Sequence, residues 1–489
     1  MPAEDILSYE FFSKDGVGAT IVYADGMVNK GLIGDLVIRP IASLNLKKQA
    51  ENSQKDEQNY QNDGDRYEIN ADLLQKSLLF PEVKEAEKIE DMTKEILDGN
   101  ALLLVDGIEK GIVVGTKMLP VRAISEPPAD VAVKGPREGF VEDFKTNATL
   151  VRKRLKSPAL RMDVMRVGRR SDTTIALCYL DGICDNRLKD ALQKKLQSID
   201  VDVLPDSSYV TALIAPRKHS LFRSVGTTEK PDVFAAKLAE GRVGILVDGS
   251  PIALTLPFTL TEDFQSSEDY FVSPFMATLF RALRLVAVMI ALFLPAVYVT
   301  TQLFKMQLLP LGLMLTIAKS AREIPFSPSM ETFFVLLLFE TLKEASIRMP
   351  KYVGMSLSVV GALVLGEAAV SAGFLSTPTI IIVALSGICL YTVPNFVETG
   401  SVLRWLYLIV AGSLGPFGLT LAGALTLYYL ISADSFGMPP LAPFSPLVAH
   451  DLKDAVAKYG IRDLDTRPKI YRSKNKTRLR TQGGNRDEN

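Results

Sequence analysis

The chain has 489 residues, of which 47% are apolar, and its formal net charge is −1. This length excludes a single ordinary hydrophobic core and predicts two or three domains. The averages alone would fit a water-soluble protein, so the class of protein has to be read from the distribution of apolar and charged residues along the chain.

The first residues predict that the N-terminal part stays in the cytoplasm. Residues 1–14 are polar and acidic, without the apolar segment that a secretory signal peptide requires. The three cysteines, Cys178, Cys184 and Cys389, are too few for a disulfide framework. Their number suits a reducing compartment.

Two pairs of similar segments predict a duplicated unit within the first 270 residues. Residues 23–29 (YADGMVN) resemble residues 179–185 (YLDGICD), and residues 99–107 (GNALLLVDG) resemble residues 241–249 (GRVGILVDG). In each copy two strand-like runs lead into Asp-Gly, a dipeptide typical of tight turns. A helix-like stretch lies between the two runs. We therefore predict two similar α/β subdomains.

These repeats set the predicted boundaries of the N-terminal part. Subdomain 1 covers residues 1–120 and carries a polar insert at about residues 45–65. A linker or helical connector follows at 121–165, and subdomain 2 covers 166–270. Basic residues at 152–156 in the connector predict either a solvated helix face or a contact with anionic headgroups or a partner.

Four long apolar segments predict that residues 271–448 form a bundle of membrane-spanning helices. They are residues 285–304, 353–375, 378–393 and 405–431. Uncharged apolar runs of 18 or more residues are long enough to cross the roughly 30 Å hydrocarbon layer as helices. The fold class expected for the whole chain is thus an α+β membrane protein, with a duplicated α/β cytoplasmic N-terminal domain followed by an α-helical transmembrane bundle.

Proline and glycine predict irregularities in the first and last of these segments. Pro295 should kink the first segment. The last segment is interrupted by Gly412, Gly415-Pro416 and Gly418, which allow either two half-helices or one broken helix. Between the first and second segments, residues 308–318 and 333–344 are apolar but short.

Charged residues in the membrane part are the candidate functional residues. Glu340, Glu344 and Arg348 recur every four residues and lie on one face of a helix, which predicts an amphipathic or re-entrant element at 333–344. Glu367 is the only charge between residues 353 and 396. A carboxylate in the middle of a bilayer costs at least ~2.5 kcal/mol, so these side chains should face a pore or another subunit. Alternatively, pairs such as Glu344 with Arg348 only lock helices together.

The basic tail at 449–489 sets the predicted topology. Lysines and arginines at residues 469–480 place it in the cytoplasm. Both termini then lie on one side, and the number of spans is even. Four spans satisfy this condition, and six do so if the short elements cross.

Nothing in the sequence predicts an enzyme, a cofactor or a nucleic-acid partner. His219 and His450 are the two histidines, and neither has a cysteine, serine or carboxylate constellation near it in sequence. The chain also lacks metal-ligand spacing and a nucleotide-binding loop.

A series of motifs in fixed order runs from about residue 23 to residue 440. The motifs are residues 135–140 (GPREGF), 150–154 (LVRKR), 167–170 (VGRR), 264–271 (FQSSEDYF), 281–298, 322–326 (REIPF) and 342–350 (LKEASIRMP). In these motifs the chain resembles the A subunit of the GerA family of spore germinant receptors.

The resemblance implies a multi-pass subunit of a receptor complex in the spore inner membrane. Its partners would be a permease-like B subunit that senses nutrient, a lipoprotein C subunit and further copies of itself. Such copies are thought to form a ring whose helices make a nutrient-gated channel for inorganic ions. Two alternatives remain open: a membrane-anchored scaffold or sensor that conducts nothing, and a secondary transporter. Broken helices favour the transporter, but the membrane part lacks two matching halves.

Overall fold

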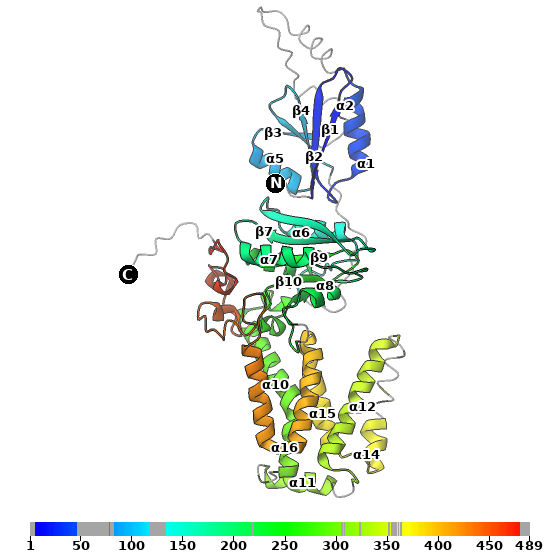
Figure 1. Cartoon of the computed structure of the whole chain (residues 1–489), viewed down its shortest axis with the longest axis vertical. Helices are drawn as coiled ribbons and strands as arrows, with labels where there is room; N and C mark the ends of the chain where they lie inside the picture. Colours follow the sequence, from blue (N-terminus) through cyan, green and yellow to red (C-terminus); the bar gives the residue numbers. More distant parts are fainter. Residues whose placement is uncertain are drawn as a thin grey trace, which may run out of the picture. The chain divides into compact units, whose positions relative to one another are not determined.

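The structure is a computed structural model and describes residues 5–45, 78, 83–116, 134–217, 220–304, 307, 309–321, 324–350, 353, 359, 361 and 364–479. The chain divides into two compact units (Figure 1). The first comprises Met1–Lys218, Val225–Pro257 and Asp465–Asn489, and the second comprises His219–Ser224 and Phe258–Leu464.

The first unit contains two antiparallel five-stranded sheets. The first sheet has the order β1-β2-β4-β5-β3. Its strands are β1 (Ile6–Phe12), β2 (Gly18–Ala24), β3 (Val83–Ala86), β4 (Ala101–Val105) and β5 (Gly111–Val114). The helical segments of this subdomain are α1 (Lys30–Ile33), the π-helix η1 (Gly34–Ile38), α2 (Arg39–Ser43) and α5 (Ile89–Leu97).

The second sheet has the order β6-β7-β9-β10-β8. Its strands are β6 (Leu160–Val167), β7 (Thr173–Leu180), β8 (Gly226–Thr228), β9 (Val243–Val247) and β10 (Ala253–Leu256). The helices of this subdomain are α6 (Phe144–Arg154), α7 (Asn186–Gln197), α8 (Ser207–Ile214) and α9 (Pro231–Ala239).

The two sheets repeat one topology, as the paired sequence segments predict. Tyr23 in β2 pairs with Leu7 of the edge strand β1, and Tyr179 in β7 pairs with Arg161 of the edge strand β6. Each central strand then ends in an Asp-Gly turn whose glycine has positive φ, at 77° for Gly26 and 75° for Gly182. Because the two tyrosine strands occupy equivalent places, the predicted equivalence of the subdomains is confirmed.

The C-terminal segment does not form a separate tail. Residues 465–479 fold onto the second sheet's subdomain and belong to the first unit. Lys474 N donates to Ile183 O at 2.9 Å, and Arg467 Nε donates to Ala239 O at 2.7 Å. The buried ring of Tyr471 lies under the Arg242 guanidinium, 4.1 Å from its central carbon. The segment predicted as one basic tail at 449–489 is thus divided: residues up to Leu464 belong to the second unit, and backbone acceptors of the second sheet's subdomain hold residues after Asp465.

The second unit is helical. Short 3-10 turns η2 (Leu260–Phe264) and η3 (Ser267–Tyr270) lead into it, and η6 (Pro394–Phe396) lies within it. Its helices are α10 (Pro274–Phe304), α11 (Leu311–Ala321), α12 (Pro328–Arg348), the π-helix η5 (Val364–Ala368), α14 (Ala369–Ser371), α15 (Thr377–Leu390) and α16 (Val397–Ile431). The turns η7 (Asp451–Asp454), η8 (Ile461–Asp463) and, in the first unit, η9 (Lys469–Tyr471) follow.

Helix α16 is a hairpin of two helices. Gly415 has φ 63° and ψ −149°, which no helix tolerates, and Pro416 follows it. Phe222 packs near both Phe396 before the hairpin and Tyr429 near its end, with ring centroids 6.3 Å and 6.1 Å away. The two ends of α16 therefore lie together, so the predicted interruption is confirmed as two half-helices, 397–414 and 416–431. We call this end of the unit the Phe222 end.

The opposite end of the unit, which we call the Phe304 end, is where α10 stops. A Cβ on Gly415 would lie 3.0 Å from the Phe304 ring, and a Cβ on Gly412 would lie 3.1 Å from Ser329 at the start of α12. Helix α15 also begins at this end and returns to the Phe222 end, where Leu390 packs with Phe396. Helix α10 and the first half of α16 thus run toward the Phe304 end, and α12, α15 and the second half of α16 run toward the Phe222 end. Helix α11 lies across the Phe304 end (Figure 1).

The structure differs from the prediction for the element at residues 333–344. Helix α12 has 21 residues and is not the short element expected at 333–344, because Ser327 caps its N-terminus and Pro328 occupies its first turn. The predicted span 353–375 lies largely outside the described residues. Of this segment the structure describes η5 and α14, which lead to the Phe304 end.

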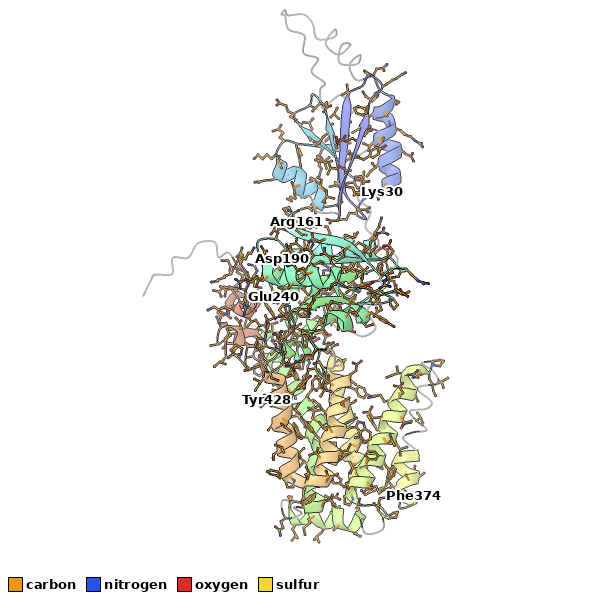
Figure 2. All side chains as sticks on the ribbon, viewed as in Figure 1. Lys30, Arg161, Asp190, Glu240, Phe374 and Tyr428 are labelled. Carbon is orange, nitrogen blue, oxygen red and sulfur yellow. The ribbon has the colours of Figure 1, made fainter. Side chains whose placement is uncertain are left out.

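Apolar side chains cover much of the outside of the helical unit. Figure 2 shows Phe374 and Tyr428 projecting from it, and both are exposed. By length and composition two helices among the described residues are able to cross a membrane, Pro274–Phe304 and Pro394–Ile431.

Candidate functional site

The candidate site is a group of charged side chains on and around α12. Glu340 lies in the second half of α12, where it faces α16. Its carboxylate forms ion pairs with Arg404 of α16 and with Lys343 one turn along its own helix. Arg404 also donates through Nη1 to Ser386 Oγ of α15 at 3.1 Å. One acid therefore connects three helices.

The burial of this network sets its electrostatics. The side chain of Arg404 is 1% exposed and that of Glu340 is 17% exposed. Inside a low-dielectric helical unit, an unpaired charge of this kind would be costly, so the pair stabilises both groups against desolvation. Ser386 in turn donates to Ala291 O of α10 at 2.8 Å, which extends the network to a fourth helix.

The other predicted residues lie apart from this network. Glu344 and Arg348 form an ion pair at 2.6 Å on the outside of α12, with side chains 57% and 78% exposed. Glu367 lies in η5 and is also exposed. The structure thus separates the four predicted residues into one internal acid and three outward-facing groups.

Sequence reasoning missed Arg404, Lys343 and Glu331. Arg404 immediately precedes the apolar segment predicted at 405–431 and was not singled out. Glu331 is buried in the first turn of α12. Glu331 is isolated from other acids in the sequence, so it gave no periodic signal. Its hydrogen-bond partner, the backbone of Ser376, is 45 residues away.

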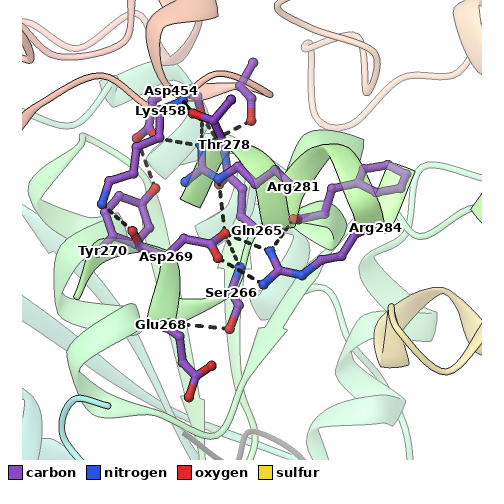
Figure 3. Close-up of polar contacts among 12 residues, drawn as sticks. Gln265, Ser266, Glu268, Asp269, Tyr270, Thr278, Arg281, Arg284, Asp454 and Lys458 are labelled. Atoms are coloured by element: carbon purple, nitrogen blue, oxygen red, sulfur yellow. Dashed lines mark hydrogen bonds and ion pairs between the residues drawn. The ribbon is translucent and has the colours of Figure 1, made fainter. Parts of the chain in front are cut away.

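A second charged cluster ties the start of α10 to the segment after α16 (Figure 3). We call it the Asp269 clasp. Asp269 accepts from Arg281 Nε at 3.1 Å and from Arg284 Nη1 and Nη2 at 2.8 and 2.9 Å. Arg281 also donates to Asp454 Oδ1 at 2.9 Å. Lys458 donates to the backbone oxygen of Asp269, and all of these groups belong to the second unit.

The clasp keeps Asp269 ionised. Burial by itself would raise the pKa of this carboxyl. The hydrogen bonds from Arg284, Ser266 N and Arg281, together with the arginine charges, outweigh burial and hold the pKa of Asp269 below its ordinary value.

Metal ligands of the usual kind do not gather in the part of the chain that the structure describes. No group of three or more histidine, cysteine, aspartate or glutamate side chains is arranged there to hold a metal ion. Each acid of the helical unit named so far, apart from Glu331 and Glu367, forms an ion pair with a basic side chain.

Known proteins resemble this chain over nearly its whole length. An uncharacterized membrane protein of Bacillus subtilis, YfkQ, is 34% identical over 96% of this chain and 88% of its own length. Spore germination protein KA of Bacillus subtilis is 34% identical over 95% of this chain and 83% of its own length. Spore germination protein GerQA of Bacillus cereus is 36% identical over 82% of this chain and 81% of its own length.

Among solved structures, the crystal structure of the N-terminal domain of the A subunit of the Bacillus megaterium spore germinant receptor GerK3 is similar. It is 26% identical and covers 52% of this chain and 88% of its own, with a TM-score of 0.36.

The family model described as Bacillus/Clostridium GerA spore germination protein matches residues 2–470. With relatives above 30% identity over most of both chains, the resemblance found in the sequence motifs is confirmed. This chain belongs to the GerA family of spore germination proteins.

Proposed function

We propose that this chain is a membrane subunit of a nutrient-germinant receptor in the spore inner membrane. Several copies assemble, together with a permease-like B subunit and a lipoprotein C subunit, into a germinant-gated channel for inorganic ions that starts germination. The observation that carries the proposal is the outward-facing Glu344–Arg348 pair. Exposed charges on a helix of an apolar helical unit need water or another subunit beside them.

The path of the chain supports six crossings with both termini in the cytoplasm. Helix α10 and the first half of α16 lead from the Phe222 end to the Phe304 end, and α12, α15 and the second half of α16 lead back. The chain must also travel between the end of α12 and Ser376, which requires a sixth passage. The contact of Tyr471 with Arg242 supports the even number, because the C-terminal segment lies in the same unit as the sheets.

A cysteine-labelling experiment tests this topology in intact cells or protoplasts that express the receptor. A cysteine at Ser413, exposed beside the hairpin turn, should react with an impermeant maleimide from outside, and one at Lys476 should not. Cys389 is replaced by alanine beforehand. Burial raises the pKa of the Cys178 thiol and raises that of Cys184 to about 12, so these two thiols react slowly. Labelling of both engineered positions from the same side would contradict the hairpin topology.

A non-conducting scaffold is the second candidate function. The observation that favours it is the Glu340 network, in which the acid is neutralised by Arg404 and Lys343 and connects helices of one chain. In this case Glu340 stabilises the packing of the helices. Of the four predicted residues, Glu344, Arg348 and Glu367 then remain for a pore or a contact between subunits.

Ion flux through reconstituted receptor separates the two functions. Wild-type complex, Glu344→Gln and Glu398→Gln are placed in vesicles under a potassium gradient, and reversal potential and conductance are recorded. Glu398 is an exposed acid at the start of α16 and serves as the matched control. We expect a severalfold change in conductance or cation selectivity for Glu344→Gln only. A wild-type complex that assembles but conducts no ions would contradict the channel and leave the scaffold as the supported function.

A further inference from the structure

A buried polar cluster lies at the Phe304 end, where α12 and α15 begin and α10 approaches its end. We call it the Glu331 cluster, and its members are Glu331, Ser376, Thr379 and Tyr298. Ser376 N donates to Glu331 Oε1 at 2.6 Å. The Ser376 and Thr379 hydroxyls are 2.8 Å apart, and Thr379 Oγ1 is 3.1 Å from the Tyr298 hydroxyl. Three helices thus bring a carboxylate and three hydroxyl groups together.

Glu331 differs from the other buried acids in lacking a basic partner among the described residues. Glu340 has Arg404 and Lys343, and Asp269 has two arginines. The residue is 3% exposed, yet Ser376 N is its one hydrogen-bond donor in the described part of the chain, and this donor reaches only Oε1. The N-terminus of α12 and the N-cap amide of α15 offset part of the desolvation of this carboxylate, and a bound cation would offset the rest.

The chemistry of the neighbouring groups selects the ligand. Every side chain of the cluster offers oxygen, and Gln302, one helical turn after Tyr298 and also buried, adds an amide on the same face of α10. Oxygen ligands suit hard cations, whereas zinc and copper sites use nitrogen or sulfur. A single carboxylate supplies one negative charge, while Ca²⁺ and Mg²⁺ sites in proteins usually combine several acids or a substrate phosphate.

We propose that the Glu331 cluster binds a monovalent metal cation, Na⁺ or K⁺, through the Glu331 carboxylate and the surrounding hydroxyl oxygens. Its position at the ends of α12 and α15 gives the ion access from the Phe304 end without passage through the rest of the helical unit. The bound ion would hold α10, α12 and α15 together at this end. This proposal concerns binding and does not depend on whether the receptor conducts ions.

Thermal unfolding of the purified full-length receptor complex in detergent tests the proposal. The midpoint is measured from 1 to 300 mM NaCl or KCl, with ionic strength held constant by N-methylglucamine chloride. A ligand that binds only the folded state raises the midpoint with its concentration. We expect this rise for wild type and for Glu398→Gln, whose exposed side chain at the start of α16 lies outside the cluster.

The decisive variant is Glu331→Gln. Glutamine still accepts a hydrogen bond from Ser376 N but has no charge, so a role limited to capping α15 survives the change, whereas cation binding does not. We expect the unfolding midpoint of this variant to be independent of Na⁺ and K⁺. If wild type shows no cation dependence, or Glu331→Gln shows the same dependence as wild type, the proposal is overturned.

A second variant covers the case in which Glu331→Gln fails to fold. Tyr298→Phe keeps the ring and removes one oxygen ligand. We expect it to raise the half-saturating cation concentration severalfold. An unchanged half-saturating concentration in a folded Tyr298→Phe protein would contradict the assignment of the ligands.

Discussion

Arg404 on α16 forms an ion pair with Glu340 on α12, and the same guanidinium donates to Ser386 on α15. Replacing Glu340 with glutamine leaves Arg404 and Lys343 without their anion inside the helical unit. We expect the variant to lose about 3 kcal/mol of unfolding free energy, the usual cost of breaking a buried pair from one side. Denaturation of the detergent-solubilised protein measures this loss.

The matched control for that variant is Glu344→Gln. The exposed pair of Glu344 with Arg348 should contribute less than about 1 kcal/mol. Equal losses for the two glutamine variants would show that Glu340 is not held in the internal network.

Asp269→Asn tests the clasp at the start of α10. The change leaves Arg281 and Arg284 without the carboxylate between them, and we expect a loss of about 3 kcal/mol. Asp434→Asn, which alters an exposed loop acid bonded to Gly437 N, is the control and should cost much less. A loss for Asp269→Asn no larger than that of the control would mean that the clasp contributes little.

The same residue predicts a dependence of stability on pH. The folded-state pKa of Asp269 lies below the ordinary carboxyl value of about 3.9. Its contribution is therefore fully present above that value and is lost as the pH falls through the lowered pKa. Between about pH 5 and pH 2, wild type should lose more stability than Asp269→Asn. Parallel stability curves for the two proteins in this window would contradict the assignment.

Gly415→Ala tests the hairpin turn of α16. The backbone at Gly415 occupies a region that is essentially restricted to glycine, and an added Cβ would meet the Phe304 ring at 3.0 Å. We expect a destabilisation of about 2 kcal/mol. Gly423→Ala, in the second half of α16, is the control, because its nearest neighbour would be Phe293 at 3.7 Å. There alanine should be neutral or should stabilise the helix slightly. Thermal melts of both variants decide the matter, and a harmless Gly415→Ala would argue against a hairpin at this position.

Tyr471→Ala tests the docking of the C-terminal segment. The variant removes the ring under Arg242, and we expect cleavage at Lys474 and Lys476 by trypsin to become at least about tenfold faster, since local opening becomes easier. Tyr471→Phe keeps the ring and should change the rate little. Identical cleavage rates for wild type and Tyr471→Ala would contradict the docking.

The duplication of the two subdomains was predictable because it is encoded in short local signals. The Asp-Gly dipeptides after Tyr23 and Tyr179 require specific backbone conformations, and their order repeats. The break at Gly415-Pro416 was predictable for the same reason, since both residues act on the backbone where they stand.

The internal charge network was not predictable, because its partners are distant in sequence. Glu340 and Arg404 are separated by 64 residues, and their contact depends on how α12 packs on α16. Periodicity placed Glu340 with Glu344 on one helix face, but it cannot tell which neighbour covers each turn of that face. The docking of Tyr471 was missed for a similar reason, since a basic segment has no local signal for the residues, such as Arg242, that it will contact.

The contact between Arg242 and Tyr471 also has a consequence for the order in which the protein is made. Its two residues are 229 positions apart, and the whole helical unit is synthesised between them. The sheets can fold soon after they leave the ribosome, because the strand pairings in each of them lie within a span of little more than a hundred residues. Tyr471 can reach Arg242 only after the last helix of the helical unit has been translated. A docked C-terminal segment therefore marks a chain whose helical unit has been completed.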